Sequence, residues 1–251
     1  MRTQSAFAEG RALATQSTIH VGQKPGAWVI ERWRSSYRIW MPWIIALTIV
    51  CGLLIDQHFD TYGQIAVDTW TWAMFGLLLS LVTPSERPAL IACLLIATIG
   101  EVVLSLVWGL YIYRLHNIPL FVPPGHVLLF WLGIQLSARL PYALLRAVAP
   151  VSAVVIVGLA FAGLDWFSVP LLGLFLLCWR FGPAARLYAT MFVLSFVMEM
   201  CGTSIGNWTW QSHVPWLAWP TTNPPLAAGA FYCALDLLVM LAIGQRKKSV
   251  A

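Results

Sequence analysis

The sequence predicts an all-α membrane protein, a polytopic bundle of about eight transmembrane helices in two parallel four-helix halves. Hydrophobic residues make up 59% of the 251 residues and charged residues only 10%, whereas soluble domains carry about 25% charged residues. Apolar stretches recur from residue 39 to the C-terminus, and roughly 20 apolar residues suffice to span a bilayer. A motif that occurs twice, about a hundred residues apart, indicates the two halves.

Eight spans form the expected transmembrane domain 39–244, whose halves are 39–138 and 145–244. The spans cover roughly residues 39–57, 64–82, 89–110, 118–138, 145–163, 166–180, 185–207 and 225–244. Residues 1–38 contain no apolar segment typical of a secretory signal, so we expect a cytoplasmic tail followed by an interfacial segment. Residues 245–251 are expected to form a basic cytoplasmic tail.

The Lys and Arg residues indicate the orientation of the spans. With both termini cytoplasmic, fourteen of the 15 basic residues lie on the cytoplasmic side and Arg114 alone lies outside. Positive residues stay cytoplasmic during insertion, so this split favours an even number of spans in an inner or plasma membrane. It also accounts for the net charge of +5, and no nucleic-acid partner is expected.

The repeated motif reads Gly, any, aromatic, any, aromatic, any, any, His. It occurs as GLYIYRLH (109–116) and as GNWTWQSH (206–213), preceded by Glu101 and Glu199 respectively. Aromatic residues are common at membrane interfaces, but this does not explain Gly, His and Glu at matching positions. We interpret the motif as an old, divergent parallel repeat. The Pro-rich segments that follow, 118–126 and 214–225, are expected to be rigid loops or, for the second, a lid.

Four acidic residues fall within the expected spans: Asp68, Glu101, Glu199 and Asp236. Together with His126 they lie at the midplane or toward the outer side. A carboxylate in hydrocarbon costs at least about 2.5–3.5 kcal/mol, so these side chains are expected to face one interior cavity. A neutral acid in such a cavity is a proton donor, and the alternative is a set of buried hydrogen bonds that fix helix packing.

Aromatic and amide side chains close to these acids complete the candidate site, because aromatic faces stabilise cations. The expected catalytic residues are Glu101, Glu199, Asp236, His126 and Tyr232. The expected substrate-binding residues are Asp68, Trp108, Tyr111, Tyr113, Trp208, Trp210, Asn207 and Asn223.

No metal and no cofactor are expected. The five His residues form none of the closely spaced pairs that metal sites use, and the five Cys residues form no CxxC pair. A carboxylate-rich metal site made from Glu101, Glu199, His126 and Asp236 is the weaker alternative.

The segment EVVLSLVWGLYIYRLHNIPLFVP (101–123) resembles integral-membrane carotenoid-modifying proteins of the bisanhydrobacterioruberin hydratase type. In that pattern a span carries Glu, followed by Gly-x-Tyr-x-Tyr and a Pro-containing loop. The resemblance implies a lipid-soluble polyene substrate and acid chemistry without a redox cofactor, with Glu101 as the matching glutamate. PPGH (123–126) and GNWTWQSH depart from the pattern.

The sequence therefore favours a membrane enzyme acting on a hydrophobic isoprenoid or other lipid by hydration, cyclisation or isomerisation. Its expected partners are the bilayer and a hydrophobic small molecule. Two other function classes remain open. Parallel repeats and midplane acids also occur in proton-coupled transporters, and a non-catalytic lipid-binding or assembly subunit would leave the acids replaceable.

Overall fold

The computed structural model describes residues 27–249, so residues 1–26 and 250–251 of the expected tails lie outside the described part. The chain divides into a unit that ends at Tyr37 and a second unit that begins at Arg38. The packing and the site described below belong to the second unit.

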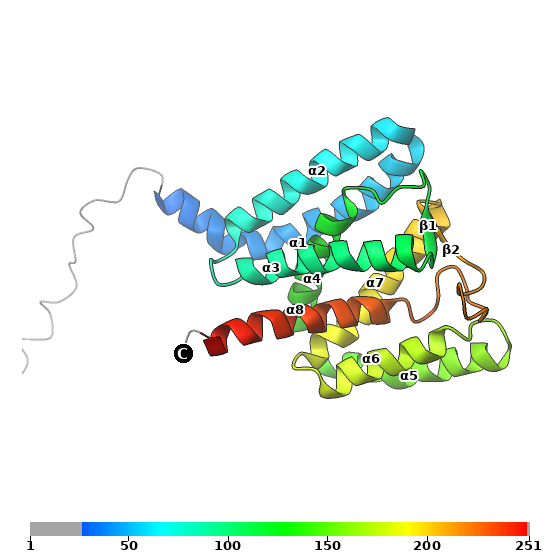
Figure 1. Cartoon of the computed structure of the whole chain (residues 1–251). Helices are drawn as coiled ribbons and strands as arrows, with labels where there is room; N and C mark the ends of the chain where they lie inside the picture. The colour runs from blue at the N-terminus through cyan, green and yellow to red at the C-terminus, as the bar shows by residue number, and fades with distance from the viewer. Residues whose placement is uncertain (1–26, 250–251) are drawn as a thin grey trace, which may run out of the picture. The chain divides into compact units, whose positions relative to one another are not determined.

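Residues 27–249 form eight α-helices, one π-helical segment and two short strands (Figure 1). The helices are α1 (Ala27–His58), α2 (Asp60–Leu81), α3 (Arg87–Glu101), α4 (Val122–Arg139), α5 (Tyr142–Phe161), α6 (Ser168–Phe181), α7 (Ala185–Ile205) and α8 (Gly229–Ser249). The π-helical segment η2 (Val102–Val107) continues α3, and the strands are β1 (Tyr111–Tyr113) and β2 (Trp208–Trp210). The predicted helical class is confirmed.

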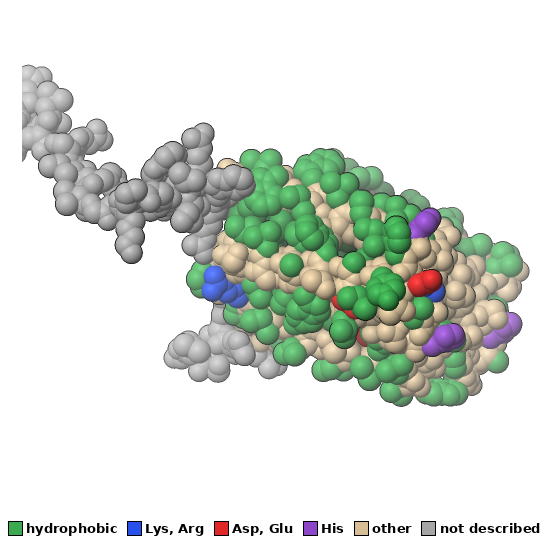
Figure 2. Space-filling model, turned by 90° about the horizontal axis from the view of Figure 1, so that it is seen from above, with side chains coloured by type: hydrophobic (Ala, Val, Ile, Leu, Met, Phe, Trp, Pro, Cys, Tyr) green, Lys and Arg blue, Asp and Glu red, His purple; other side chains and the backbone are tan. Residues whose placement is uncertain are grey.

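Four helices of the described chain are long and apolar enough to cross a membrane: Ser36–His58, Arg87–Val107, Tyr142–Phe161 and Ala185–Ile205. The apolar parts of α6 and α8 are shorter, while α2 and α4 contain more polar side chains, including Asp68 and His126. Figure 2 shows one face covered largely by hydrophobic side chains, with His and acidic side chains toward one end. Exposed residues such as Trp43 and Tyr62 would be unfavourable in water but suit a lipid surface.

Several helix contacts of the second unit correspond between the first four helices and the last four, although α5, α6 and α7 pack against one another more extensively than α1, α2 and α3 do. Helix α3 packs against α4 and α8, and α7 packs against α8 and α4. Likewise α2 packs against α4, and α6 packs against α8. Helices α3, α4, α7 and α8 thus form the centre, and α2 and α6 occupy corresponding places beside it (Figure 1).

Several helix limits differ from the expected spans. Helix α1 begins at residue 27 rather than 39, so the expected interfacial segment is largely part of this helix. The expected spans 89–110 and 185–207 end earlier, because the chain leaves the helix at the two motifs to form β1 and β2. Helix α8 begins at Gly229, after Pro224 and Pro225, which lack the N–H that a helix interior requires.

The two copies of the motif pair with each other. β1 and β2 are antiparallel, with Tyr111 opposite Trp210, Ile112 opposite Thr209, and Tyr113 opposite Trp208. The backbone bonds just outside the strands are also equivalent: Arg114 N donates to Asn207 O at 2.9 Å, and Gln211 N donates to Leu110 O at 2.9 Å. Each motif supplies the partner strand of the other.

The Gly of each motif begins the turn from helix to strand. Gly109 has φ +72° and Gly206 has φ +95°, a left-handed conformation that favours Gly over other residues. Glu101 precedes its Gly by eight residues and Glu199 by seven. The difference of one residue coincides with η2, because a π-turn accommodates one more residue than an α-turn.

Replacing either Gly109 or Gly206 by Ala is expected to lower the free energy of unfolding by about 1–2 kcal/mol, the cost of left-handed backbone for an L-residue. A Cβ at Gly109 meets nothing within 4 Å, so backbone strain alone acts there. Thermal unfolding in detergent measures the effect. Gly158→Ala, at an open position within α5 with φ outside the left-handed range, is the control and should not destabilise.

Candidate functional site

Glu101 and Glu199 are buried side chains that end α3 and lie near the end of α7, respectively. The Oε2 atom of Glu101 accepts hydrogen bonds from the hydroxyl groups of Tyr111 at 2.9 Å and Tyr113 at 2.7 Å. The Oε2 atom of Glu199 accepts hydrogen bonds from the indole N–H groups of Trp208 at 2.8 Å and Trp210 at 3.0 Å. Each glutamate is therefore held by the two aromatic residues of its own motif.

The other oxygen of each carboxyl group faces a ring from the helix that follows the motif. Nε2 of His126, on α4, lies 3.5 Å from Glu101 Oε1, and the Tyr232 hydroxyl group, on α8, donates to Glu199 Oε1 at 2.9 Å. The rings of His126 and Tyr232 are stacked, with centroids 5.0 Å apart and an angle of 6°. The stack joins the two carboxyl environments.

The contact of His126 with the backbone of Val122 determines which ring nitrogen carries the proton. Its Nδ1 lies 2.9 Å from the carbonyl oxygen of Val122, which can only accept a hydrogen bond, so Nδ1 carries a proton. Nε2 is then the nitrogen that can exchange a proton with Glu101. Glu101 and His126 thus form a pair between which a proton can move.

The donors around the two glutamates differ chemically. Glu101 is bound by two phenol groups and faces an imidazole. Glu199 is bound by two indole N–H groups, which only donate hydrogen bonds, and by one phenol group. The geometry is thus repeated, but only Glu101 has an imidazole beside it.

Two cavities meet at this cluster, and each is mainly apolar. The α1–α2 cavity is lined mainly by residues of α1, α2, α4 and the paired strands β1 and β2, among them Thr48, Val67 and Leu129. The α3–α8 cavity is lined mainly by residues of α3, η2 and α8. Both are lined by the same five polar or aromatic residues: Glu101, Tyr111, His126, Glu199 and Tyr232. Neither lining contains Lys or Arg.

Three expected site residues bind other parts of the chain and lie outside both cavities. The indole N–H of Trp108 donates to Pro215 O at 3.3 Å, and its ring stacks on Trp216 in the Pro-rich segment. Asn223, in that same segment, accepts a hydrogen bond from the backbone N–H of Trp210 at 2.9 Å. Asp68 accepts the backbone N–H of Phe121, just before α4, at 2.6 Å.

Asp236 lies one turn beyond Tyr232 on α8 but lines neither cavity. Its side chain is fully buried, and neither of its oxygens has a hydrogen-bond partner among the described residues. The structure therefore brings together Glu101, Glu199, His126 and Tyr232, and leaves Asp236 apart from them.

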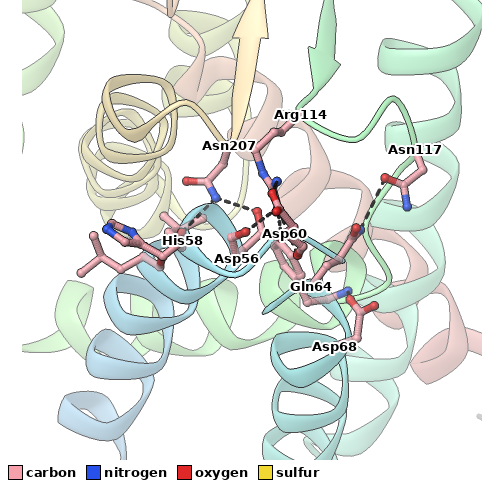
Figure 3. Close-up of polar contacts among 11 residues, drawn as sticks. Asp56, His58, Asp60, Gln64, Asp68, Arg114, Asn117 and Asn207 are labelled. Carbon is pink, nitrogen blue, oxygen red and sulfur yellow. Dashed lines mark hydrogen bonds and ion pairs between the residues drawn. The ribbon is translucent and has the colours of Figure 1, made fainter. Parts of the chain in front are cut away.

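Asn207 belongs to a polar network that lies beside β1 and β2, which Figure 3 shows. Its side-chain N–H₂ group donates to Asp56 Oδ2 at 2.7 Å and to Leu53 O at 3.0 Å. Arg114 lies 3.6 Å from Asp56 Oδ1 and 3.3 Å from Asp60 Oδ1. These contacts connect β1 and β2 to the end of α1 and the start of α2, so Asn207 helps to fix the position of the two strands.

Sequence reasoning missed Asp165, which lies before α6 and is fully buried. It accepts hydrogen bonds from the Ser168 hydroxyl group at 2.6 Å, the Thr222 hydroxyl group at 3.0 Å and the Leu226 N–H at 2.9 Å. Asp68 holds the segment before α4 in the same manner. The signal in the sequence is an acid one residue before the expected sixth span.

Asp165→Ala is expected to lower the free energy of unfolding by about 1–3 kcal/mol, because it leaves the N–H groups of Ser168 and Leu226 without an acceptor. Limited proteolysis should then cut within residues 214–225, which Asp165 holds through Thr222 and Leu226. Asp60→Ala is the control, because the Asp60 side chain is 90% exposed; equal cleavage in both variants would contradict this role for Asp165.

No group of three or more His, Cys, Asp or Glu side chains within the described residues has an arrangement that could hold a metal ion. Comparison of the chain with protein-family models, with curated proteins and with solved structures finds no match.

Proposed function

We propose that this chain is a membrane enzyme of eight spans, in two parallel four-helix halves, that protonates a hydrophobic isoprenoid or other lipid at the pair Glu101 and Glu199. The observation that supports it best is the pair of buried carboxyl groups at the junction of two apolar cavities. Aromatic rings surround the junction and suit a carbocation. The distribution of Lys and Arg favours cytoplasmic termini and a site toward the opposite side.

In the proposed reaction, Glu101 in its acid form transfers the proton on Oε1 to one carbon of an alkene, and the π-electrons form the new C–H bond. The neighbouring carbon becomes cationic and is stabilised by Glu199, whose carboxylate is fixed by three donors. The cation then takes up water, and the resulting oxonium ion gives a proton to the Glu199 carboxylate. Alternatively, an adjacent carbon gives that proton, either directly to leave an isomerised alkene or after a second double bond of the chain has attacked the cation to close a ring. His126 Nε2 exchanges the proton that restores Glu101.

The resemblance of residues 101–123 to carotenoid hydratases favours a polyene and the addition of water. Glu101 is the residue that this resemblance and the cavity geometry have in common. Asp236 is proposed to act indirectly, through α8 and the position of Tyr232, since it lines neither cavity.

Deuterium incorporation tests the proposed function. Cells with and without the protein are grown with an acyclic isoprenoid polyene in D₂O, and extracted lipids are compared by mass spectrometry. A product with one non-exchangeable C–D bond, present only with the protein, is expected. A product without such deuterium would contradict carbon protonation, and loss of a pH gradient in proteoliposomes without product would instead indicate a proton-coupled carrier.

A further inference from the structure

The α3–α8 cavity opens between two helices that carry apolar side chains to the surface. Ile99 on α3 is 63% exposed, Val103 on η2 is 44% exposed and Leu238 on α8 is 52% exposed. Residues Arg87–Val107, to which Ile99 and Val103 belong, have the length and hydropathy of a membrane span. The opening therefore faces the region that hydrocarbon would occupy.

The lining of this cavity is apolar from the opening to the carboxyl groups. Apart from the two carboxyl groups and the aromatic and imidazole side chains around them, the lining consists of Gly, Ala, Val, Leu, Ile and Phe residues. A charged or strongly hydrated ligand would lose its water along this path without gaining polar partners. An apolar chain would lose nothing.

Around Gly133, by contrast, α4 and α7 pack closely against each other. A Cβ at Gly133 on α4 would lie 2.2 Å from the Met191 sulfur and 3.5 Å from Leu187 Cδ1, both on α7. Side chains of α7 thus fill the space directly against the α4 backbone at this level.

We propose that the space between α3 and α8 is a lateral portal, through which a single apolar hydrocarbon chain passes from the bilayer to Glu101 and Glu199. This inference deepens the proposed function and rests on its membrane placement. Because the two cavities share the carboxyl pair, the end of the chain extends past the glutamates into the α1–α2 cavity.

Two positions allow the portal to be blocked without disturbing the carboxyl groups. A Cβ at Gly100 meets nothing within 4 Å, so Gly100→Trp can place a large ring in the cavity from the α3 wall. Ala234→Trp does so from the α8 wall. Gly173→Trp, on the exposed side of α6 and outside both cavities, is the matched control, since a Cβ there also meets nothing within 4 Å.

The test uses purified full-length protein in lipid nanodiscs that contain a linear C20 hydrocarbon with an alkyl diazirine at mid-chain. On irradiation the diazirine loses N₂, and the reactive carbon becomes bonded to a nearby carboxyl oxygen while taking up the acid proton. Peptide mass spectrometry should find the adduct on Glu101 or Glu199. Gly100→Trp and Ala234→Trp should each reduce this labelling at least tenfold, and Gly173→Trp should leave it unchanged.

Labelling of both glutamates that is unaffected by either portal variant would overturn the proposal, as would the absence of adducts on both in the parent protein. Melting temperature and monodispersity identify any variant that does not fold. Because the portal is blocked from two walls, one folded portal variant is enough to test the proposal. Labelling does not require turnover. If the portal variants reduce the labelling but the parent protein forms no deuterated product, the proposed function is refuted and the portal is not.

Discussion

Replacing Glu101 by Gln is expected to lower turnover by about 10²–10⁴-fold, the usual contribution of a general acid. Gln keeps the shape and still accepts the hydrogen bonds of Tyr111 and Tyr113, but it has no proton to transfer to carbon. Initial rates of product formation in reconstituted membranes measure the effect. The size of the loss in turnover separates two roles for Glu101. A proton donor cannot be replaced by Gln, whereas a residue that only packs could be replaced by Gln with little loss.

Glu199→Gln should show a different pattern. Its amide group can accept hydrogen bonds from Trp208 and Trp210 but carries no negative charge to stabilise a cation. If the two carboxyl groups act on the same cation, the double variant should be little slower than the slower single variant. Glu86→Gln is the control, because Glu86 lies in the turn before α3 and outside both cavities. Full activity in both site variants would refute the acid mechanism.

Replacing Gly229 by Ala is expected to destabilise the centre of the bundle by about 1–3 kcal/mol or more, the usual cost of overpacking. A Cβ at this first residue of α8 would lie 2.2 Å from the carbonyl oxygen and 2.9 Å from the carbonyl carbon of Phe192, so backbone has to move. The start of α8 would shift away from α7. Because Tyr232 lies three residues further on, its 2.9 Å hydrogen bond to Glu199 should be lost as well.

Gly244→Ala on the same helix is the matched control. A Cβ there meets nothing within 4 Å, and Ala in a helix interior is more favourable than Gly by roughly 0.5–1 kcal/mol. Thermal unfolding in detergent should therefore lower the melting temperature of Gly229→Ala and raise or preserve that of Gly244→Ala. Equal melting temperatures for the two variants would contradict the close contact of α7 and α8.

The sequence allowed the helical class and the polar centre of the site to be predicted, because both follow from local patterns. Long apolar runs have few alternatives to helices, and buried acids have to face one another or a cavity. The repeated Gly, aromatic pair and upstream Glu identified the side chains that the structure places around the two carboxyl groups. In each half the motif supplies donors to the Glu that precedes it.

Other features depend on contacts between distant segments and could not be read from spacing. A regular helix would place Ser105 and Trp108 on the face of Glu101, but η2 changes that periodicity, and Trp108 instead contacts Pro215 and Trp216. The sequence also gave no sign that β1 and β2 would pair. Asp236 has the burial expected of a site residue, but its position one turn beyond Tyr232 places it outside the cavities.

The central claim is that the two motifs fold against each other and so bring Glu101 and Glu199 to one chamber. Ile112 and Thr209 lie opposite each other in the paired strands β1 and β2. Both are exposed, which makes them suitable for a cross-linking test. Ile112→Cys and Thr209→Cys are combined in a protein whose Cys51 and Cys201 are replaced by Ala, and native membranes are treated with a short bismaleimide.

Mass spectrometry should find a cross-link within one chain between positions 112 and 209. It should find none between position 112 and a Cys introduced at Phe161, which is 86% exposed on α5. Absence of the 112–209 cross-link, in protein whose two cysteines each react with a single maleimide, would show that the motifs do not pair and would contradict the shared chamber.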